Sequence, residues 1–179
     1  MRVRGQAAEL RSREWADRVV HAVEEQVRAT AAAFESYDQP APPVAETVDL
    51  VLAVLPKAHP NPLDAEIGPF YDTASVMTLL GGVSRQAVDS RRRKHTILAL
   101  KTADDRWVYP VFQFSGRDVN PALVPAIRAF ADSPAWSAAL WFVTPNPDLD
   151  DMSPLDWVRK QQPVQVLEQS AKQTAREWR

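Results

Sequence analysis

Apolar side chains recur every three to four residues along the first part of the chain. No proline or glycine lies between Gln6 and Phe34. The apolar positions of this segment are Ala16, Val20, Val23, Val27, Ala31 and Phe34. Because an α-helix has about 3.6 residues per turn, this spacing predicts a long helix with one apolar face. That face needs a partner, either its own domain or a second copy in a short coiled coil. We therefore expect residues 1–38 to form a long N-terminal helix that can serve dimerisation.

The next segment is rich in proline and predicts a linker. Prolines at positions 40, 42 and 43 cannot continue a helix and indicate a stiff connector. The apolar run over residues 46–55 predicts a short helix that ends before Pro56, and residues 56–70 are expected to be loop. We therefore assign residues 39–70 to a linker with one short helix.

Residues 71–116 show the pattern of a helix-turn-helix followed by a hairpin. Asp72 or Thr73 can cap a helix that runs through Leu80, and Ser84 can cap a second helix after the turn Gly81-Gly82. The polar residues 102–105 separate two short apolar segments, 97–101 and 106–109, which predicts a β-hairpin wing. A winged helix-turn-helix presents its second helix to a DNA major groove.

The last third of the chain is predicted to be helical again. Helices are expected over residues 121–131 and 134–142, after the capping pair Ser153-Pro154, and after Pro163. We assign residues 117–179 to a C-terminal helical domain that binds a toxin or other partner. The expected fold class is therefore mainly α, with a helix-turn-helix, a small β-hairpin wing, a long N-terminal helix and a C-terminal helical segment.

Charge is distributed unevenly along the chain. The 179 residues carry a formal net charge of −2. Residues 85–101 contain six Lys and Arg against one Asp, a local charge of +5 that leaves −7 for the remainder. The positive charge thus lies where the helix-turn-helix is expected, as nucleic-acid binding requires.

Composition also limits the compartment. The chain has no cysteine, which excludes disulfides and thiolate chemistry and is typical of a reducing compartment. No apolar run approaches the ~20 residues that span a bilayer. We therefore expect a cytoplasmic protein without a membrane anchor.

The expected DNA contacts lie in the second helix and the wing. They are Ser84, Arg85, Gln86, Asp89, Arg92, Arg93, Lys94 and Lys101. Arginine can pair with both acceptors of guanine and glutamine with adenine, while a helix N-terminus and a basic run suit phosphates. The alternative is a solvated basic helix in a helical domain.

Other candidate chemistry is weaker. The aromatic residues at 107, 109, 112 and 114 could stack on bases, but their alternation favours a small core. The histidines at positions 21, 59 and 95 lack the spacing of metal ligands. The acidic residues Asp148, Asp150 and Asp151 have no base or nucleophile nearby in the sequence, so we interpret them as a loop that caps a helix. We expect no enzyme activity, no cofactor and no metal site.

The C-terminal helices carry many large apolar residues. We expect Leu155, Trp157, Val166, Leu167 and Trp178 to form a partner-binding surface that is independent of DNA. The alternative is that these residues complete the core, with Val166, Leu167, Ala171 and Trp178 as the buried positions of the last helix.

Two segments resemble a known family. Residues 73–114 resemble the helix-turn-helix and hairpin of actinobacterial antitoxin-like DNA-binding proteins and are similar to excisionase and MerR-type modules. Residues 144–168 resemble the toxin-binding segment of the Xre/MbcA/ParS antitoxins in the order asparagine-proline-x-leucine, serine-proline-leucine and a valine-leucine helix. Family members usually have glycine where this chain has Asp150-Asp151, and Gly82 and the long N-terminal helix are additional.

The resemblance implies a specific function. It implies an antitoxin whose C-terminal helices block a RES-domain toxin that consumes NAD and whose helix-turn-helix represses the shared operon. We expect a homodimer that binds double-stranded operator DNA, because paired half-sites supply affinity that one recognition helix lacks. The alternatives are a stand-alone transcriptional regulator and a protein-binding adaptor without a toxin partner.

Overall fold

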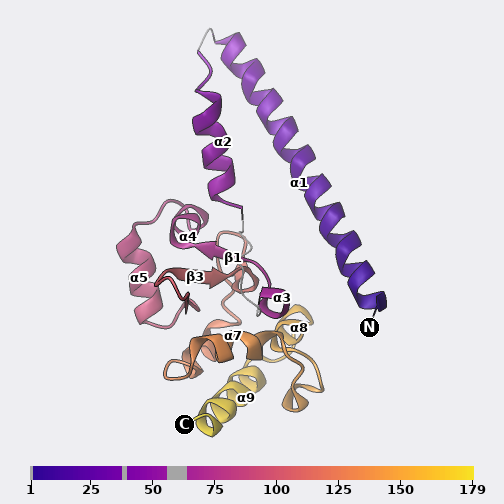
Figure 1. The fold of residues 1–179 in the computed structure, drawn as a ribbon, viewed down its shortest axis with the longest axis vertical. Coiled ribbons are helices and arrows are strands. Elements are labelled where there is room, and N and C mark those ends of the chain that lie inside the picture. The colour runs from indigo at the N-terminus through magenta and orange to yellow at the C-terminus, as the bar shows by residue number, and fades with distance from the viewer. Residues whose placement is uncertain (1, 38–39, 56–63) are drawn as a thin grey trace. The chain divides into compact units, whose positions relative to one another are not determined.

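The computed structural model describes residues 2–37, 40–55 and 64–179, which form two compact units, Met1–Val48 and Asp49–Arg179 (Figure 1). The fold is mainly helical, with a small antiparallel sheet and a long N-terminal helix, as predicted. Predictions for residues 38–39 and 56–63, including His59 and most of the expected loop, lie outside the described residues.

The first unit consists mainly of helix α1, Arg2–Ser36. Its apolar face remains accessible, since the side chains of Val20 and Val27 are 65% and 51% exposed. Helix α2, Val44–Ala53, begins in the first unit, ends in the second and contains no buried residue. The long and the short N-terminal helices are thus confirmed.

A three-stranded antiparallel sheet forms the centre of the second unit. Its strands are β1 (Phe70–Asp72), β2 (Leu100–Lys101) and β3 (Trp107–Pro110), in the order β1-β3-β2. The pairing of β2 with β3 confirms the expected hairpin. The short helix α3, Asp64–Ile67, and the first residue of β1, Phe70, lie where a loop was expected. A strand of three residues is too short to show a periodic pattern.

The helix-turn-helix connects β1 to β2. Helix α4, Thr73–Leu79, follows β1 directly, and helix α5, Arg85–Arg93, precedes β2. After β3, the 3-10 helix η1 (Val111–Gln113) leads into a second hairpin, formed by β4 (Phe114–Ser115) and β5 (Asp118–Val119).

The rest of the chain is helical, with a 3-10 turn in the middle. Its elements are α6 (Val124–Ala129), α7 (Ala135–Val143), η2 (Pro147–Leu149), α8 (Pro154–Arg159) and α9 (Val164–Glu177). The Ser153 Oγ accepts a hydrogen bond of 3.1 Å from the Asp156 N–H, which confirms the predicted cap of α8.

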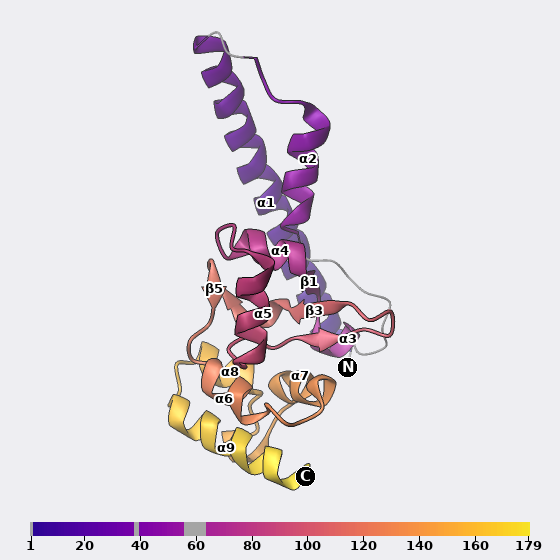
Figure 2. The same cartoon turned by 90° about the vertical axis from the view of Figure 1, so that its left-hand side faces the viewer.

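The sheet and the C-terminal helices share one core. Figure 2 shows α7 on the opposite side of the sheet from α4. The Trp136 Nε1 donates to the Lys101 carbonyl at 3.0 Å, and the rings of Phe112 and Phe142 lie 5.6 Å apart. The predicted separation of residues 71–116 from 117–179 is therefore wrong. A sheet of such short strands cannot bury its apolar face alone, and the C-terminal helices cover it.

Candidate nucleic-acid interface

The turn between α4 and α5 is closed by backbone hydrogen bonds to the end of α4. The N–H groups of Gly81 and Gly82 donate to the carbonyls of Thr78 and Met77, at 3.0 and 2.9 Å. Both glycines have positive φ, +89° and +79°, a conformation that side chains with a Cβ disfavour. The glycine pair thus ends α4 and allows α5 to begin four residues later.

Helix α5 is capped and anchored as predicted. The Ser84 Oγ accepts a hydrogen bond of 3.2 Å from the Ala87 N–H, and Val88 is fully buried beneath the helix. Arg85 and Gln86 in its first turn and Arg93 and Lys94 at its end are exposed, and we call these four the outer residues of α5. Among the described residues, no carboxylate lies within ion-pair distance of Arg85, Arg93 or Lys94. The outer residues of α5 therefore present three cations without an ion-pair partner among the described residues, and one amide.

Arg92 is not one of these outer residues. Its guanidinium lies over the Trp107 ring, 4.1 Å from the ring centroid, and its Nη2 lies 3.4 Å from the Asp89 carboxylate. The Nε of Arg92 is buried without a hydrogen-bond partner, and only 27% of the side chain is exposed. Arg92 is thus engaged with Asp89 and with Trp107 of β3, so Arg92 and Asp89 are not among the free donors of α5, and their assignment as DNA contacts stays a prediction.

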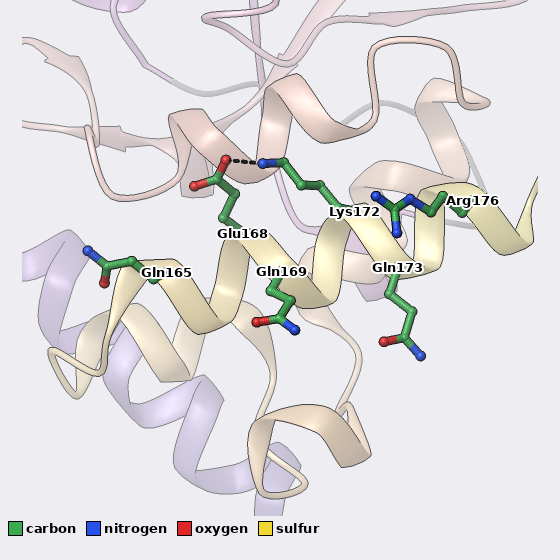
Figure 3. A pocket seen from close by; sticks show the side chains of 6 residues that line it. All are labelled: Gln165, Glu168, Gln169, Lys172, Gln173 and Arg176. Atoms are coloured by element: carbon green, nitrogen blue, oxygen red, sulfur yellow. Dashed lines mark ion pairs between the residues drawn. The ribbon is translucent and has the colours of Figure 1, made fainter.

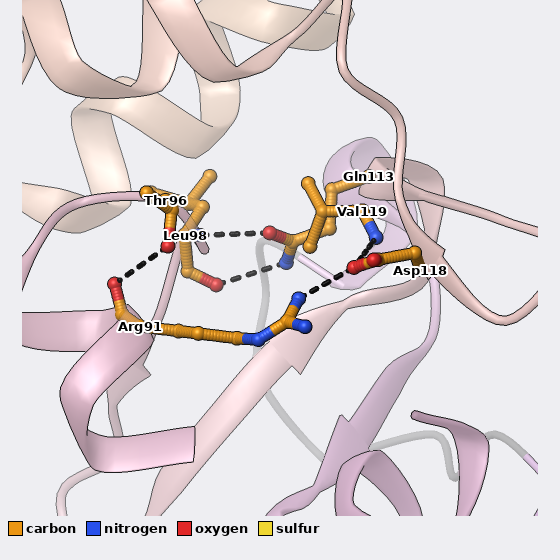
Figure 4. A network of polar contacts seen from close by, with 6 residues as sticks. All are labelled: Arg91, Thr96, Leu98, Gln113, Asp118 and Val119. Carbon is orange, nitrogen blue, oxygen red and sulfur yellow. Dashed lines mark hydrogen bonds and ion pairs between the residues drawn. The ribbon is translucent and has the colours of Figure 1, made fainter. Parts of the chain in front are cut away.

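Arg91 holds the other flank of α5. Its Nη1 lies 2.5 Å from the Asp118 Oδ1 in the β4–β5 hairpin, as Figure 4 shows. The hydrogen bond from Arg91 holds the pKa of the Asp118 carboxyl below its ordinary value. The basic run at the end of α5 therefore divides into two residues that fix the helix and two, Arg93 and Lys94, that face solvent.

A buried glutamine connects the 3-10 helix η1 to the segment that precedes β2. Gln113 is fully buried, its Oε1 accepts from the Leu98 N–H at 2.7 Å, and its Nε2 donates to the Leu98 carbonyl at 2.9 Å (Figure 4). The same Nε2 donates to the Pro110 carbonyl at 3.1 Å. The side chain thus makes the hydrogen bonds to the Leu98 backbone that a neighbouring strand would otherwise make. Sequence reasoning missed it because nothing in the local pattern marks an isolated glutamine as buried.

The tip of the β2–β3 wing is balanced in charge. Lys101 pairs with Asp105 at 2.5 Å, and Arg106 pairs with Asp104 at 2.9 Å. Lys101 is accessible as predicted, but its charge is already compensated by Asp105.

The aromatic residues of this region pack as a core. Tyr109 is fully buried, and burial is the main cause that raises the pKa of its phenol. The rings of Tyr71 and Phe114 lie 5.5 Å apart in an edge contact, and Trp107 is covered by Arg92. The interpretation of these residues as core, and not as a stacking platform, is confirmed.

The predicted partner surface on the C-terminal helices is only partly present. Leu167 is fully buried and Trp157 is 6% exposed, with its Nε1 donating to the Pro163 carbonyl at 3.0 Å. Both side chains belong to the core, Trp157 from α8 and Leu167 from α9, and this burial speaks against their assignment as partner contacts. Val166 and Trp178 are 39% and 40% exposed, and Leu155 is half-buried. The alternative prediction listed four buried positions in the last helix. Two of them, Leu167 and Ala171, are buried, whereas Val166 and Trp178 are exposed.

The acidic residues before α8 form a turn. The Asn146 Oδ1 accepts from the Asp148 N–H at 2.9 Å, and Asn146 pairs with Met152 across the turn. Asp150 and Asp151 adopt φ of +52° and +56°, a conformation that favours glycine. The turn thus places two residues other than glycine in this left-handed conformation.

A shallow hollow of about 440 Å³ lies on α9, away from α5. All six lining residues belong to α9 itself, and Glu168 and Lys172 pair across one turn at 2.6 Å (Figure 3). Its walls are long polar side chains of a solvated helix face, which supply no convergent group for a ligand.

Comparison with known proteins finds no relative for this chain: no family model, curated protein or solved structure matches it. None of the helices that the structure describes combines the length and apolar content needed to span a membrane. Within the same described residues, no three His, Cys, Asp or Glu side chains are grouped so as to hold a metal ion.

Proposed function

We propose that this chain is a sequence-specific DNA-binding protein that inserts α5 into the major groove. The observation that carries the proposal is the division of α5 into residues that fix the helix and outer residues that have no ion-pair partner among the described residues. Val88, Arg91 and Arg92 hold the helix, while Arg85, Gln86, Arg93 and Lys94 face solvent. A rigid helix with free donors at its N-terminal end is what base recognition needs.

The four outer residues would divide the work. Arg85 and Gln86, in the first turn, would read base edges, whereas Arg93 and Lys94, in the last turn, would bind phosphates. The Ser84 Oγ accepts from Ala87 but keeps its own O–H, which can donate to a phosphate at the helix N-terminus.

Within this function we propose that the protein is the antitoxin of a toxin–antitoxin pair and represses its operon in the cytoplasm. Support comes from the order of the two segments that resemble antitoxins, and from Val166 and Trp178, which leave part of α9 apolar and accessible. Its partner would be a RES-domain toxin that consumes NAD.

DNA binding is tested by titrating a labelled duplex from upstream of the protein's own gene at increasing salt. Because DNA binding releases counterions, a plot of log affinity against log salt concentration should be a falling line. Its slope should be about −0.9 for each phosphate that the protein neutralises. The absence of binding even at low salt would overturn the proposal and favour a protein-binding adaptor.

Specificity is tested by two pairs of variants on this duplex and on a scrambled one. Arg85→Ala and Gln86→Ala should each cost about 1 to 3 kcal/mol on the specific duplex and little on the scrambled one. Arg93→Ala and Lys94→Ala should weaken both duplexes equally. Identical behaviour of the two pairs would show that α5 is not the recognition helix.

The antitoxin proposal is tested by co-expression with the product of the neighbouring gene, which the proposal predicts to be a RES-type toxin. The chain should restore growth and co-purify with the toxin, and Val166→Glu should reduce both effects. Gln169→Glu, an exposed position of the same helix, is the matched control. A neighbouring gene unrelated to RES toxins, or a chain that binds no toxin, would leave a stand-alone regulator.

A further inference from the structure

A second basic tip lies beside α5, on the hairpin β4–β5. In this hairpin Ser115 pairs with Asp118, and the two residues between them are Gly116, with φ of +60°, and Arg117. Arg117 is exposed, and no carboxylate of the described residues lies within ion-pair distance of it. The tip therefore points one uncompensated cation toward solvent.

The hairpin is fixed to the recognition helix by an ion pair. The Asp118 Oδ1 accepts from the Arg91 Nη1 at 2.5 Å and from the N–H of Val119 at 2.8 Å (Figure 4). The Asp118 side chain is 63% exposed, yet these two hydrogen bonds fix its carboxylate. Arg91 thereby neutralises the anion next to Arg117 and connects the hairpin to α5 at the same time.

The two hairpins that flank α5 differ in charge. Arg92 holds one flank against Trp107 of β3, and Arg91 holds the other against Asp118 of β5. At the tip of the β2–β3 hairpin both cations are paired with aspartates. With Asp118 compensated by Arg91, the β4–β5 tip keeps the charge of Arg117.

We propose that the β4–β5 hairpin is a second DNA-contacting element, in which Arg117 binds a backbone phosphate beside the groove that receives α5. Arg91 and Asp118 act as positioning residues that hold this arginine in place. The inference rests on the proposed DNA binding by α5. A phosphate is the expected target because a lone arginine on a two-residue tip makes a charge contact, and phosphates supply most of the charge contacts in such complexes.

The first test compares Arg117→Ala with Arg128→Ala on a labelled mixed-sequence duplex over a series of salt concentrations that starts at low salt. Arg128, on α6, is exposed and serves as the matched control for the loss of one positive charge. Loss of one phosphate contact should lower affinity by about threefold to tenfold and reduce the salt slope by about 0.9. Arg128→Ala should change neither quantity to that extent.

The second test separates positioning from net charge. Asp118→Asn removes an anion near the DNA, so that charge alone would make binding tighter. If Asp118 positions the hairpin, binding should instead become weaker. The double variant Arg117→Ala/Asp118→Asn should then be no weaker than Arg117→Ala alone, because both changes remove the same contact. The melting temperature of each variant reports whether the fold is intact.

The outcomes distinguish the two proposals. Wild-type binding with equal effects of Arg117→Ala and Arg128→Ala would overturn the role of the hairpin and leave recognition by α5 standing. Tighter binding by Asp118→Asn would overturn the positioning role. A wild-type chain that binds no duplex would overturn both.

Discussion

Neighbouring arginines in one helix turn have different tasks. Arg92 lies on Trp107 and is largely buried, whereas Arg93 is exposed and unpaired within the described residues. The difference arises from helix geometry, since a step of one residue rotates the side chain by about 100° around the axis. Position in the basic run therefore does not show which arginines are accessible, whereas their packing does.

The pair Arg92→Ala and Arg93→Ala should separate stability from binding. Arg92→Ala removes the contact with Trp107 and should lower the free energy of unfolding by about 1 kcal/mol. Arg93→Ala should leave stability within about 0.5 kcal/mol of wild type but weaken DNA binding. Urea denaturation and duplex titration of both variants check this. Equal stability of the two would contradict the anchoring role of Arg92.

Gln113 is the polar residue on which the packing of this region depends most. Its replacement by alanine would leave the buried N–H and carbonyl of Leu98 without partners and would open a cavity. We expect Gln113→Ala to lower the free energy of unfolding by about 2 to 4 kcal/mol. Gln165→Ala, at an exposed position of α9, is the control and should be nearly neutral. A small effect at Gln113, measured by urea denaturation, would mean that water replaces its hydrogen bonds.

At the scale of elements, α9 is part of the core and not a separable arm. It packs on α6, buries Leu167 and Ala171, and ends with Trp178 stacked on Phe130 at 5.2 Å. Removal of the residues after Pro163 would expose the apolar surface of α6. Such a truncated chain should lose its cooperative melting transition.

Single substitutions in α9 test this role more gently. Leu167→Ala should lower the free energy of unfolding by about 2 to 5 kcal/mol, because it leaves a cavity in a packed core. Val166→Ala, on the accessible side of the same turn, should cost far less. Thermal denaturation of the two variants gives the comparison. Similar losses would show that Val166 is as buried in solution as Leu167.

At the scale of the whole molecule, α1 offers a surface for a second copy. Val20 and Val27 are seven residues apart, and Ala16 and Val23, also seven apart, each precede one of them by four residues. This register is that of a coiled-coil seam, and β-branched residues at one of its two positions favour a dimer. A helix of 35 residues with an accessible apolar stripe would be stabilised by such pairing.

We therefore expect the protein to be a dimer that requires this seam. The double variant Val20→Glu/Val27→Glu should be monomeric at micromolar concentration and should bind DNA more weakly. The double variant Ala22→Glu/Ala29→Glu places the same charges away from the seam and should remain dimeric. Light scattering distinguishes these states. A dimeric seam variant would place the interface elsewhere, and a monomeric wild type would exclude the dimer.

Much of the fold follows from local signals along the chain. The periodic apolar stripe predicts α1, the residues Asp72 and Ser84 predict the starts of α4 and α5, and Gly81-Gly82 predicts the turn between them. These signals succeed because helix periodicity, caps and positive-φ turns depend on residues close in sequence. The accessible residues Arg85, Gln86, Arg93 and Lys94 follow from the same local geometry.

Other features depend on residues that are distant in sequence. The three-residue strand β1, the burial of Gln113, and the pairing of Arg91 with Asp118 arise from contacts across 15 or more positions. The burial of Trp157 and Leu167 likewise depends on which surfaces the C-terminal helices cover. An apolar or charged residue has the same local pattern whether it faces a partner, DNA or its own core, and only packing in three dimensions distinguishes these environments.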